Sequence, residues 1–109
     1  MAEAVYILQA IDEQIAQVEG GPELAVALGV SYDDARRTVK RDTGESLGSH
    51  IEKRRVDLMK RLLRTTTLQC GEIAQVVGYR RVETAFRAFK RRCGMTMSEY
   101  RSVIIRGRF

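Results

Sequence analysis

Apolar residues recur at intervals of three and four along most of the chain, which is the spacing of helices with one buried face. The first predicted helix has its apolar positions at Ala4, Leu8, Ile11, Ile15 and Val18. Gly20 and Gly21 end it, and Pro22 begins the next helix, because a proline in the first turn lacks only an N–H that would have no intrahelical acceptor.

The later helices are predicted from end signals and from a second apolar stripe. Ser31 with Asp34, and Thr96 with Glu99, have the spacing of N-terminal capping boxes. Further helices are expected over residues 22–28, 31–44, 47–64, 71–77, 82–92 and from 96 onward. The longest carries its stripe at Leu47, Ile51, Leu58, Met59, Leu62 and Leu63. No alternation typical of strands appears, so we predict an all-α fold of about seven helices.

The chain contains an internal repeat, in which residues 23–44 lie over residues 72–94. Identical residues at an offset of 49 are Glu23 and Glu72, Ala25 and Ala74, and Gly29 and Gly78. At an offset of 50 they are Lys40 and Lys90, Arg41 and Arg91, and Gly44 and Gly94. Each copy is a short helix, a turn with glycine, and a second helix with basic residues, which is the pattern of a helix-turn-helix.

With two such units in register, the sequence resembles the DNA-binding domain of the AraC/XylS transcription regulators. The resemblance covers residues 22–101 and is carried by "ELAVALGVS", "VKRDTGESL", "EKRRVDLMKRLL", "GEIAQVVGY", "FKRRCG" and "SEYR". It implies two helix-turn-helix subdomains, residues 1–46 and 65–109, joined by a long connecting helix at 47–64. It also implies that one monomer places two recognition helices in adjacent major-groove segments, and that the protein activates transcription by touching RNA polymerase.

The sequence departs from the family pattern at five positions. The family usually has proline at the position of Met97 and an aromatic residue at that of Val39. It has a larger aliphatic residue at the position of Ala35 and a bulky apolar residue at that of Ala85. Phe86 lies one residue after the position of that bulky apolar residue. These departures bear on how the first unit packs and on the pose of the second recognition helix.

Charge is segregated along the chain. All 19 Lys and Arg residues lie at or after Arg36, whereas seven of the 14 acidic residues precede it. The part from Arg36 onward therefore has 19 cations against seven acids, a net charge of +12, although the whole chain has +5. Such a basic segment favours a polyanionic partner, and double-stranded DNA fits the repeat.

The residues expected to read bases lie at the start of each second helix, the end that a helix-turn-helix presents to the major groove. In the first unit they are Asp33, Arg36 and Arg37, and in the second unit Arg81, Glu83, Thr84 and Arg87. An arginine can donate two hydrogen bonds to guanine, and Glu83 can accept from a cytosine amine. This assignment supposes that Phe86 and Phe89 are both turned inward.

Other polar residues are expected to contact phosphates. They are Tyr32, Lys40, Lys53, Arg54, Arg80, Lys90, Arg91 and Arg92. The alternative for each residue is a solvated surface side chain that makes no DNA contact. Arg55 is expected on the inner side of the long helix, where the family also carries arginine, as a buttress between the two halves.

The sequence does not support an enzymatic or a metal-binding function. His50 is the sole histidine, and Cys70 and Cys93 are too few for a metal cluster and fit buried apolar positions. We expect no cofactor and no metal. No apolar run approaches the roughly 18 residues of a membrane span, so a cytoplasmic protein without membrane contact is expected.

Two functions from different classes stay open at this point. The first is a sequence-specific transcription regulator whose readers lie about 34 Å apart, one DNA turn. The second is a protein-interaction module that keeps the fold without reading DNA and docks through the acidic helix from Glu3 to Glu19. The sequence leaves open the DNA target, activation versus repression, any effector, and whether the chain is a complete regulator or the C-terminal part of a longer one.

Overall fold

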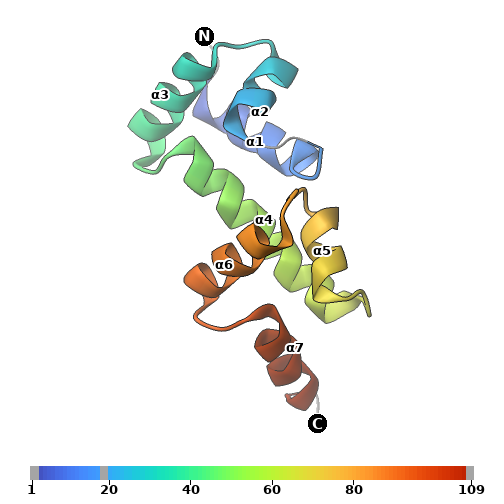
Figure 1. Cartoon of the computed structure of the whole chain (residues 1–109). Coiled ribbons are helices and arrows are strands. Elements are labelled where there is room, and N and C mark those ends of the chain that lie inside the picture. Colours follow the sequence, from blue (N-terminus) through green and yellow to red (C-terminus); the bar gives the residue numbers. More distant parts are fainter. Residues whose placement is uncertain (1–2, 18–19, 108–109) are drawn as a thin grey trace. The chain divides into compact units, whose positions relative to one another are not determined.

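A computed structural model of the chain describes residues 3–17 and 20–107, and these form helices with no strand among them (Figure 1). The helices are α1 (Ala4–Gln14), α2 (Gly21–Leu28), α3 (Tyr32–Thr43), α4 (Leu47–Thr65), α5 (Cys70–Val76), α6 (Val82–Cys93) and α7 (Met97–Arg106). The all-α fold of seven helices is therefore confirmed. None of the helices within the described ranges is long and apolar enough to cross a membrane.

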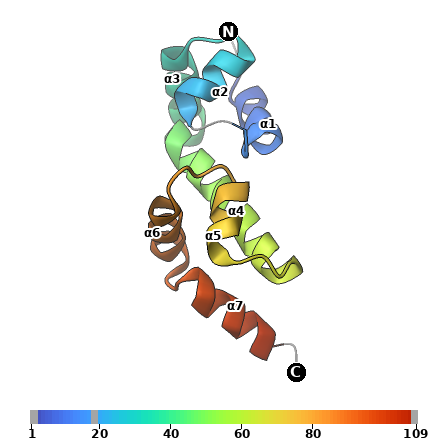
Figure 2. The ribbon, with the colours of Figure 1, turned by 45° about the vertical axis from the view of Figure 1, so that its right-hand side comes forward.

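The chain forms two compact units, Met1–Arg54 and Arg55–Phe109, and the division falls within α4. In the first unit, α1, α2 and α3 pack against one another (Figure 2). Its core includes Ile7, Ile11, Leu24, Val39 and Leu47, all at most 1% exposed.

The first helix differs from its prediction at two points. It ends at Gln14, although Ile15 remains in helical conformation and is buried. Leu8 is only half-buried and Ile7 is fully buried, because the inner stripe is centred on Ala4, Ile7 and Ile11. The predicted inner position at Val18 lies outside the described residues.

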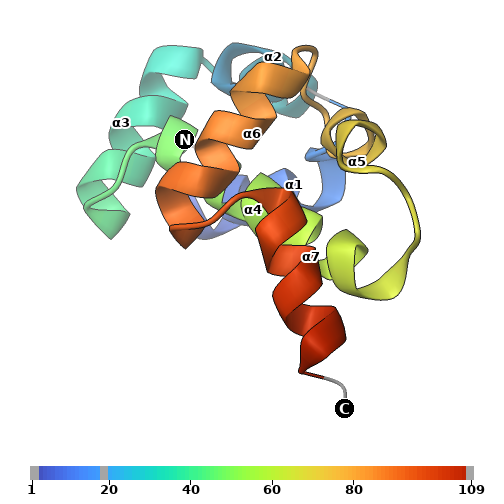
Figure 3. The same cartoon turned by 60° about the horizontal axis from the view of Figure 1, so that its bottom comes forward.

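In the second unit, α5 and α6 pack on the later part of α4 (Figure 3). The central residue is Phe89, which is fully buried and meets the Tyr100 ring edge to face, with centroids 5.5 Å apart. Arg55 is buried, as expected for the inner side of α4, and its guanidinium lies 5.0 Å from the centre of the Tyr79 ring. This cation–π contact lies within the second unit.

The repeat in the sequence is also a repeat in the structure. At an offset of 50, the buried residues of α3 and α6 correspond one to one: Ala35 and Ala85, Thr38 and Ala88, Val39 and Phe89. Gly44 and Gly94 end the two helices in the left-handed conformation, with φ of 81° and 76°. Each donates its N–H to a lysine carbonyl four residues earlier, so α3 and α6 end in the same way.

Candidate nucleic-acid interface

Each of α3 and α6 is the second helix of a helix-turn-helix, formed by α2 with α3 and by α5 with α6, and follows a turn in which a glycine has positive φ, 70° at Gly29 and 103° at Gly78. Ser31 is the N-cap residue of α3, and its Oγ accepts the Asp34 N–H at 3.4 Å, which is the Ser31 half of the capping box that the sequence predicts. Arg81 is the N-cap residue of α6. Both helices have one face in the core, with Ala85, Ala88 and Phe89 on α6, and the opposite face toward solvent.

All seven predicted base-reading residues are exposed. Asp33, Arg36 and Arg37 lie on α3 in the first unit, and the four of the second unit lie at the N-terminal half of α6 or directly before it. The structure thus gathers each group on one helix of its own unit. Contact with bases stays a prediction.

On α3 the arginines are paired with neighbouring carboxylates. Arg36 lies 3.6 Å from Asp33, and Arg37 lies 3.0 Å from Asp34, both at a spacing of three residues. Exposed pairs of this kind contribute about 0 to 1 kcal/mol, so exchanging them for a base or phosphate costs little. The acids also occupy the first turn of α3, where the helix dipole favours negative charge.

The residues predicted to contact phosphates have diverse surroundings. Lys40 Nζ donates to the Gly44 carbonyl at 2.9 Å and so covers the C-terminal end of α3. Arg54 Nε lies 3.0 Å from Asp12 on α1, so part of its charge is already balanced. Lys53, Arg80, Lys90, Arg91 and Arg92 are exposed.

Tyr32 has a structural contact that the sequence does not reveal. Its side chain is 39% exposed, and its ring packs on Gly21 so closely that a Cβ built there would lie 2.8 Å from Cε1. The first turn of α2 therefore holds the ring, and contact of the hydroxyl with a phosphate stays a prediction.

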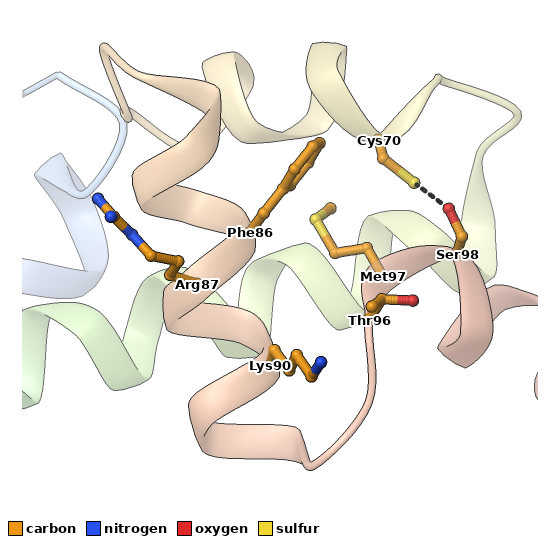
Figure 4. Close-up of a pocket in the computed structure, with 7 residues that line it drawn as sticks. All are labelled: Cys70, Phe86, Arg87, Lys90, Thr96, Met97 and Ser98. Carbon is orange, nitrogen blue, oxygen red and sulfur yellow. Dashed lines mark hydrogen bonds between the residues drawn. The ribbon is translucent and has the colours of Figure 1, made fainter.

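The prediction that Phe86 is turned inward is wrong, because its side chain is 40% exposed. The inward face of α6 is formed by Ala85, Ala88 and Phe89, and Phe86 lies about 100° around the helix from Ala85. It borders a pocket of about 210 Å³ within the second unit (Figure 4). The pocket is lined by Cys70, Phe86, Arg87, Lys90, Thr96, Met97 and Ser98.

The cysteines are less buried than the sequence suggests. Cys70 and Cys93 are free thiols and only half-buried, although both pack against the core. Cys70 lies at the first residue of α5, where one side of the helix faces solvent, and its Sγ is 3.7 Å from Ser98 Oγ. Proximity of the α5 and α7 starts is a tertiary feature without a local sequence signal.

His50 lies in the first turn of α4 and contacts the C-terminal end of α3. Its Nε2 lies 2.8 Å from Thr43 Oγ1, and that hydroxyl also donates to the Val39 carbonyl at 2.7 Å. The histidine thus forms a side-chain hydrogen bond with the last residue of α3. Over residues 3–17 and 20–107, no cluster of three or more His, Cys, Asp or Glu side chains is placed to hold a metal ion.

Comparison with known proteins places this geometry among regulators. A model of the helix-turn-helix domain family matches residues 24–102. The xylose operon regulatory protein of Escherichia coli strain K12 is 31% identical over 77 residues, 71% of this chain and 20% of that protein, so the chain spans about a fifth of that relative. The regulatory protein SoxS of Salmonella typhimurium strain LT2 is 34% identical over 95 residues, covering 87% of this chain and 89% of that protein.

A solved structure extends the comparison to the fold. The DNA-binding domain of AdpA, described as a global transcriptional factor and solved in complex with a target DNA, superposes with a TM-score of 0.82. The superposition covers 94% of this chain and 93% of that domain at 21% sequence identity. At this identity the likeness shows a common fold.

Proposed function

The chain belongs to the AraC-type helix-turn-helix DNA-binding domains of transcription regulators, and from this membership we propose that one copy reads two adjacent major-groove segments and activates transcription. The observation that supports two-segment reading is the structural repeat, which gives each helix-turn-helix its own second helix with one exposed face. Each helix carries residues able to recognise base edges.

The two readers differ in chemistry, so the two DNA segments should differ too. The α3 reader has Asp33, Arg36 and Arg37, whereas the α6 reader combines Glu83 and Arg87 with two further residues. At the position of Arg36, α6 has Phe86, which cannot donate hydrogen bonds. A single chain therefore requires an asymmetric site, with its two segments centred about 10 bp apart.

Activation and contact with RNA polymerase are the parts of the proposal that come from the family resemblance alone. The relatives are described as regulatory proteins, and the chain covers only a fifth of one of them. We propose that, once seated on its site, the domain recruits the polymerase through a surface away from α3 and α6.

The alternative function, docking of a protein partner through the first helix, has one observation in its favour. Val5 and Tyr6 on α1 are 62% and 51% exposed, beside the acidic Glu3. An exposed apolar pair with acidic surroundings suits a protein contact better than a DNA contact, because DNA would repel the acid. Docking through α1 would be compatible with DNA reading by α3, so absence of DNA binding is what distinguishes the alternative function.

Mobility shift of a random-sequence duplex at 50 and 200 mM salt tests DNA binding itself. A domain that makes six phosphate contacts should lose about 10³-fold in affinity across this range. Changing Arg37 and Arg87 together to Ala should leave most of this non-specific binding in place. An affinity that is the same at both salt concentrations, or no shift at either one, would exclude DNA binding. Protein docking would then be the remaining function.

A further inference from the structure

The pocket of the second unit combines an apolar wall with a cation. Phe86 and Lys90 extend from α6 toward Met97, whereas Arg87 extends to the other side of the helix (Figure 4). Met97 is 3% exposed and Phe86 40%. On the far side, Ser98 and Cys70 form a polar edge, with Oγ and Sγ 3.7 Å apart. An occupant with an apolar part and a negative charge matches this lining.

The repeat provides an internal comparison, because the corresponding place in the first unit is filled. In the first unit, the residues equivalent to Cys70, Met97 and Val82 are Gly21, Leu47 and Tyr32. A Cβ added at Gly21 would lie 2.8 Å from the Tyr32 ring and 3.2 Å from Leu47 Cδ2. Valine has no ring to occupy this space in the second unit. The pocket is therefore a property of the second unit and not of the repeat.

The pocket also lies where a DNA strand is expected. In a helix-turn-helix complex the first helix crosses the sugar–phosphate backbone while the second enters the groove. In the second unit these helices are α5 and α6, and the pocket is lined by the first residue of α5 and by one flank of α6. The strand that borders the groove read by α6 must pass along this flank.

We propose that the pocket takes one deoxyribose–phosphate unit of that strand. The sugar packs against Phe86 and Met97, and the phosphate is bound by Lys90 Nζ and the Ser98 hydroxyl. This assignment rests on the proposed DNA-reading function and adds to it a seat for the backbone that the first unit lacks. Because a fixed seat accepts only one local path of the strand, it makes the second segment sensitive to DNA shape.

The apolar wall has a second consequence, discrimination against ribose. A 2′-hydroxyl pressed against Phe86 and Met97 would lose its water without gaining a partner. One ribonucleotide introduced at the seated position should therefore weaken binding, while ribonucleotides elsewhere in the duplex should have smaller effects. The penalty should shrink in Phe86→Ala, which removes the more exposed part of the wall and leaves Met97 and the core residue Phe89 in place.

Thiol reactivity tests whether DNA covers the pocket. In the Cys93→Ser protein Cys70 is the only thiol, and its reaction with methyl methanethiosulfonate, a small uncharged reagent, is timed with and without the selected duplex. With duplex at ten times its Kd, the rate should fall about tenfold by mass action. The matched control is Cys70→Ser, in which Cys93, outside the pocket lining, should change less than about twofold.

Binding measurements then test the sugar seat. Phe86→Ala should weaken the selected duplex about fivefold, as expected for loss of a partly buried aromatic contact. If the duplex binds but Cys70 reacts at its free rate, the pocket is not on the DNA path and the proposal is overturned, while the proposed function stands. If Cys70 is protected but no single ribonucleotide is penalised, the sugar seat is wrong. A protein that binds no duplex refutes the proposed function itself.

Discussion

Replacing Arg101 by Met should loosen the second unit, because one guanidinium ties α7 to the end of α4 and to the segment before α5. Its Nη1 donates to the Leu68 carbonyl at 2.6 Å, its Nη2 to Thr66 at 3.1 Å and its Nε to Leu63 at 3.3 Å. Methionine keeps the apolar stem of the side chain and removes all three donors. The three carbonyls that lose their donor lie in the last turn of α4 and in the segment after it, where no helical N–H replaces the lost hydrogen bonds.

The size of the effect follows from these bonds. A hydrogen bond to a charged group contributes about 1.5 to 3 kcal/mol, but Arg101 is only half-buried and water can replace part of each bond. At about 1 kcal/mol for each, Arg101→Met should lower the free energy of unfolding by about 2 to 4 kcal/mol. Arg101→Lys, which keeps the charge without the fork of donors, should fall in between.

Urea unfolding followed by far-UV circular dichroism gives the overall loss, and hydrogen exchange in residues 66–69 gives the local one. The matched control is Arg106→Met, an exposed arginine of the same helix, which should change stability by less than about 0.5 kcal/mol. Should Arg101→Met and Arg106→Met have equal midpoints, the three bonds contribute nothing and α7 is held by its apolar contacts alone.

Three further changes have expected results. The Thr96 N–H and hydroxyl hold the pKa of Glu99 below its usual value. The carboxylate therefore stabilises the fold fully above about pH 4.3, and this stabilisation is lost as the pH falls through the lowered pKa. Glu99→Gln should make the urea midpoint depend less on pH over that acid range. Gly44→Ala should cost about 1 kcal/mol in thermal unfolding because its φ is 81°, whereas Gly48→Ala inside α4 should stabilise slightly. Lys53→Ala should make the slope of log K against log salt shallower by about 0.9 in filter binding.

Elements with strong local signals could be predicted from the sequence. The Thr96 and Glu99 capping box is present, with the Thr96 N–H 2.8 Å from Glu99 Oε1 and the Glu99 N–H 3.1 Å from Thr96 Oγ1. The third helix was expected to end near Gly44, which is the C-cap residue of α3, and its repeat counterpart Gly94 ends α6 in the same way. In each case the signal and its effect lie within one turn of chain, where backbone chemistry decides the outcome.

Features decided by distant partners could not be predicted. Phe86 lies at the border of the apolar stripe, so its exposure depends on what α5 and α7 place beside it. The acceptors of Arg101 are backbone carbonyls, which every residue has and no sequence pattern marks. The pairing of Arg54 with Asp12 joins residues far apart in the chain, and it changes the charge available for a predicted phosphate contact.

Selection of bound sequences from a random duplex library, repeated with Arg37→Ala and Arg87→Ala, tests the two-reader proposal most directly. We expect one chain on an asymmetric site whose two segments are centred about 10 bp apart. Arg37→Ala should relax the preference in one segment and Arg87→Ala in the other, each at a cost of about 1 to 3 kcal/mol. A symmetric site occupied by two chains, or loss of preference at the same base pairs in both variants, would contradict reading by a single chain.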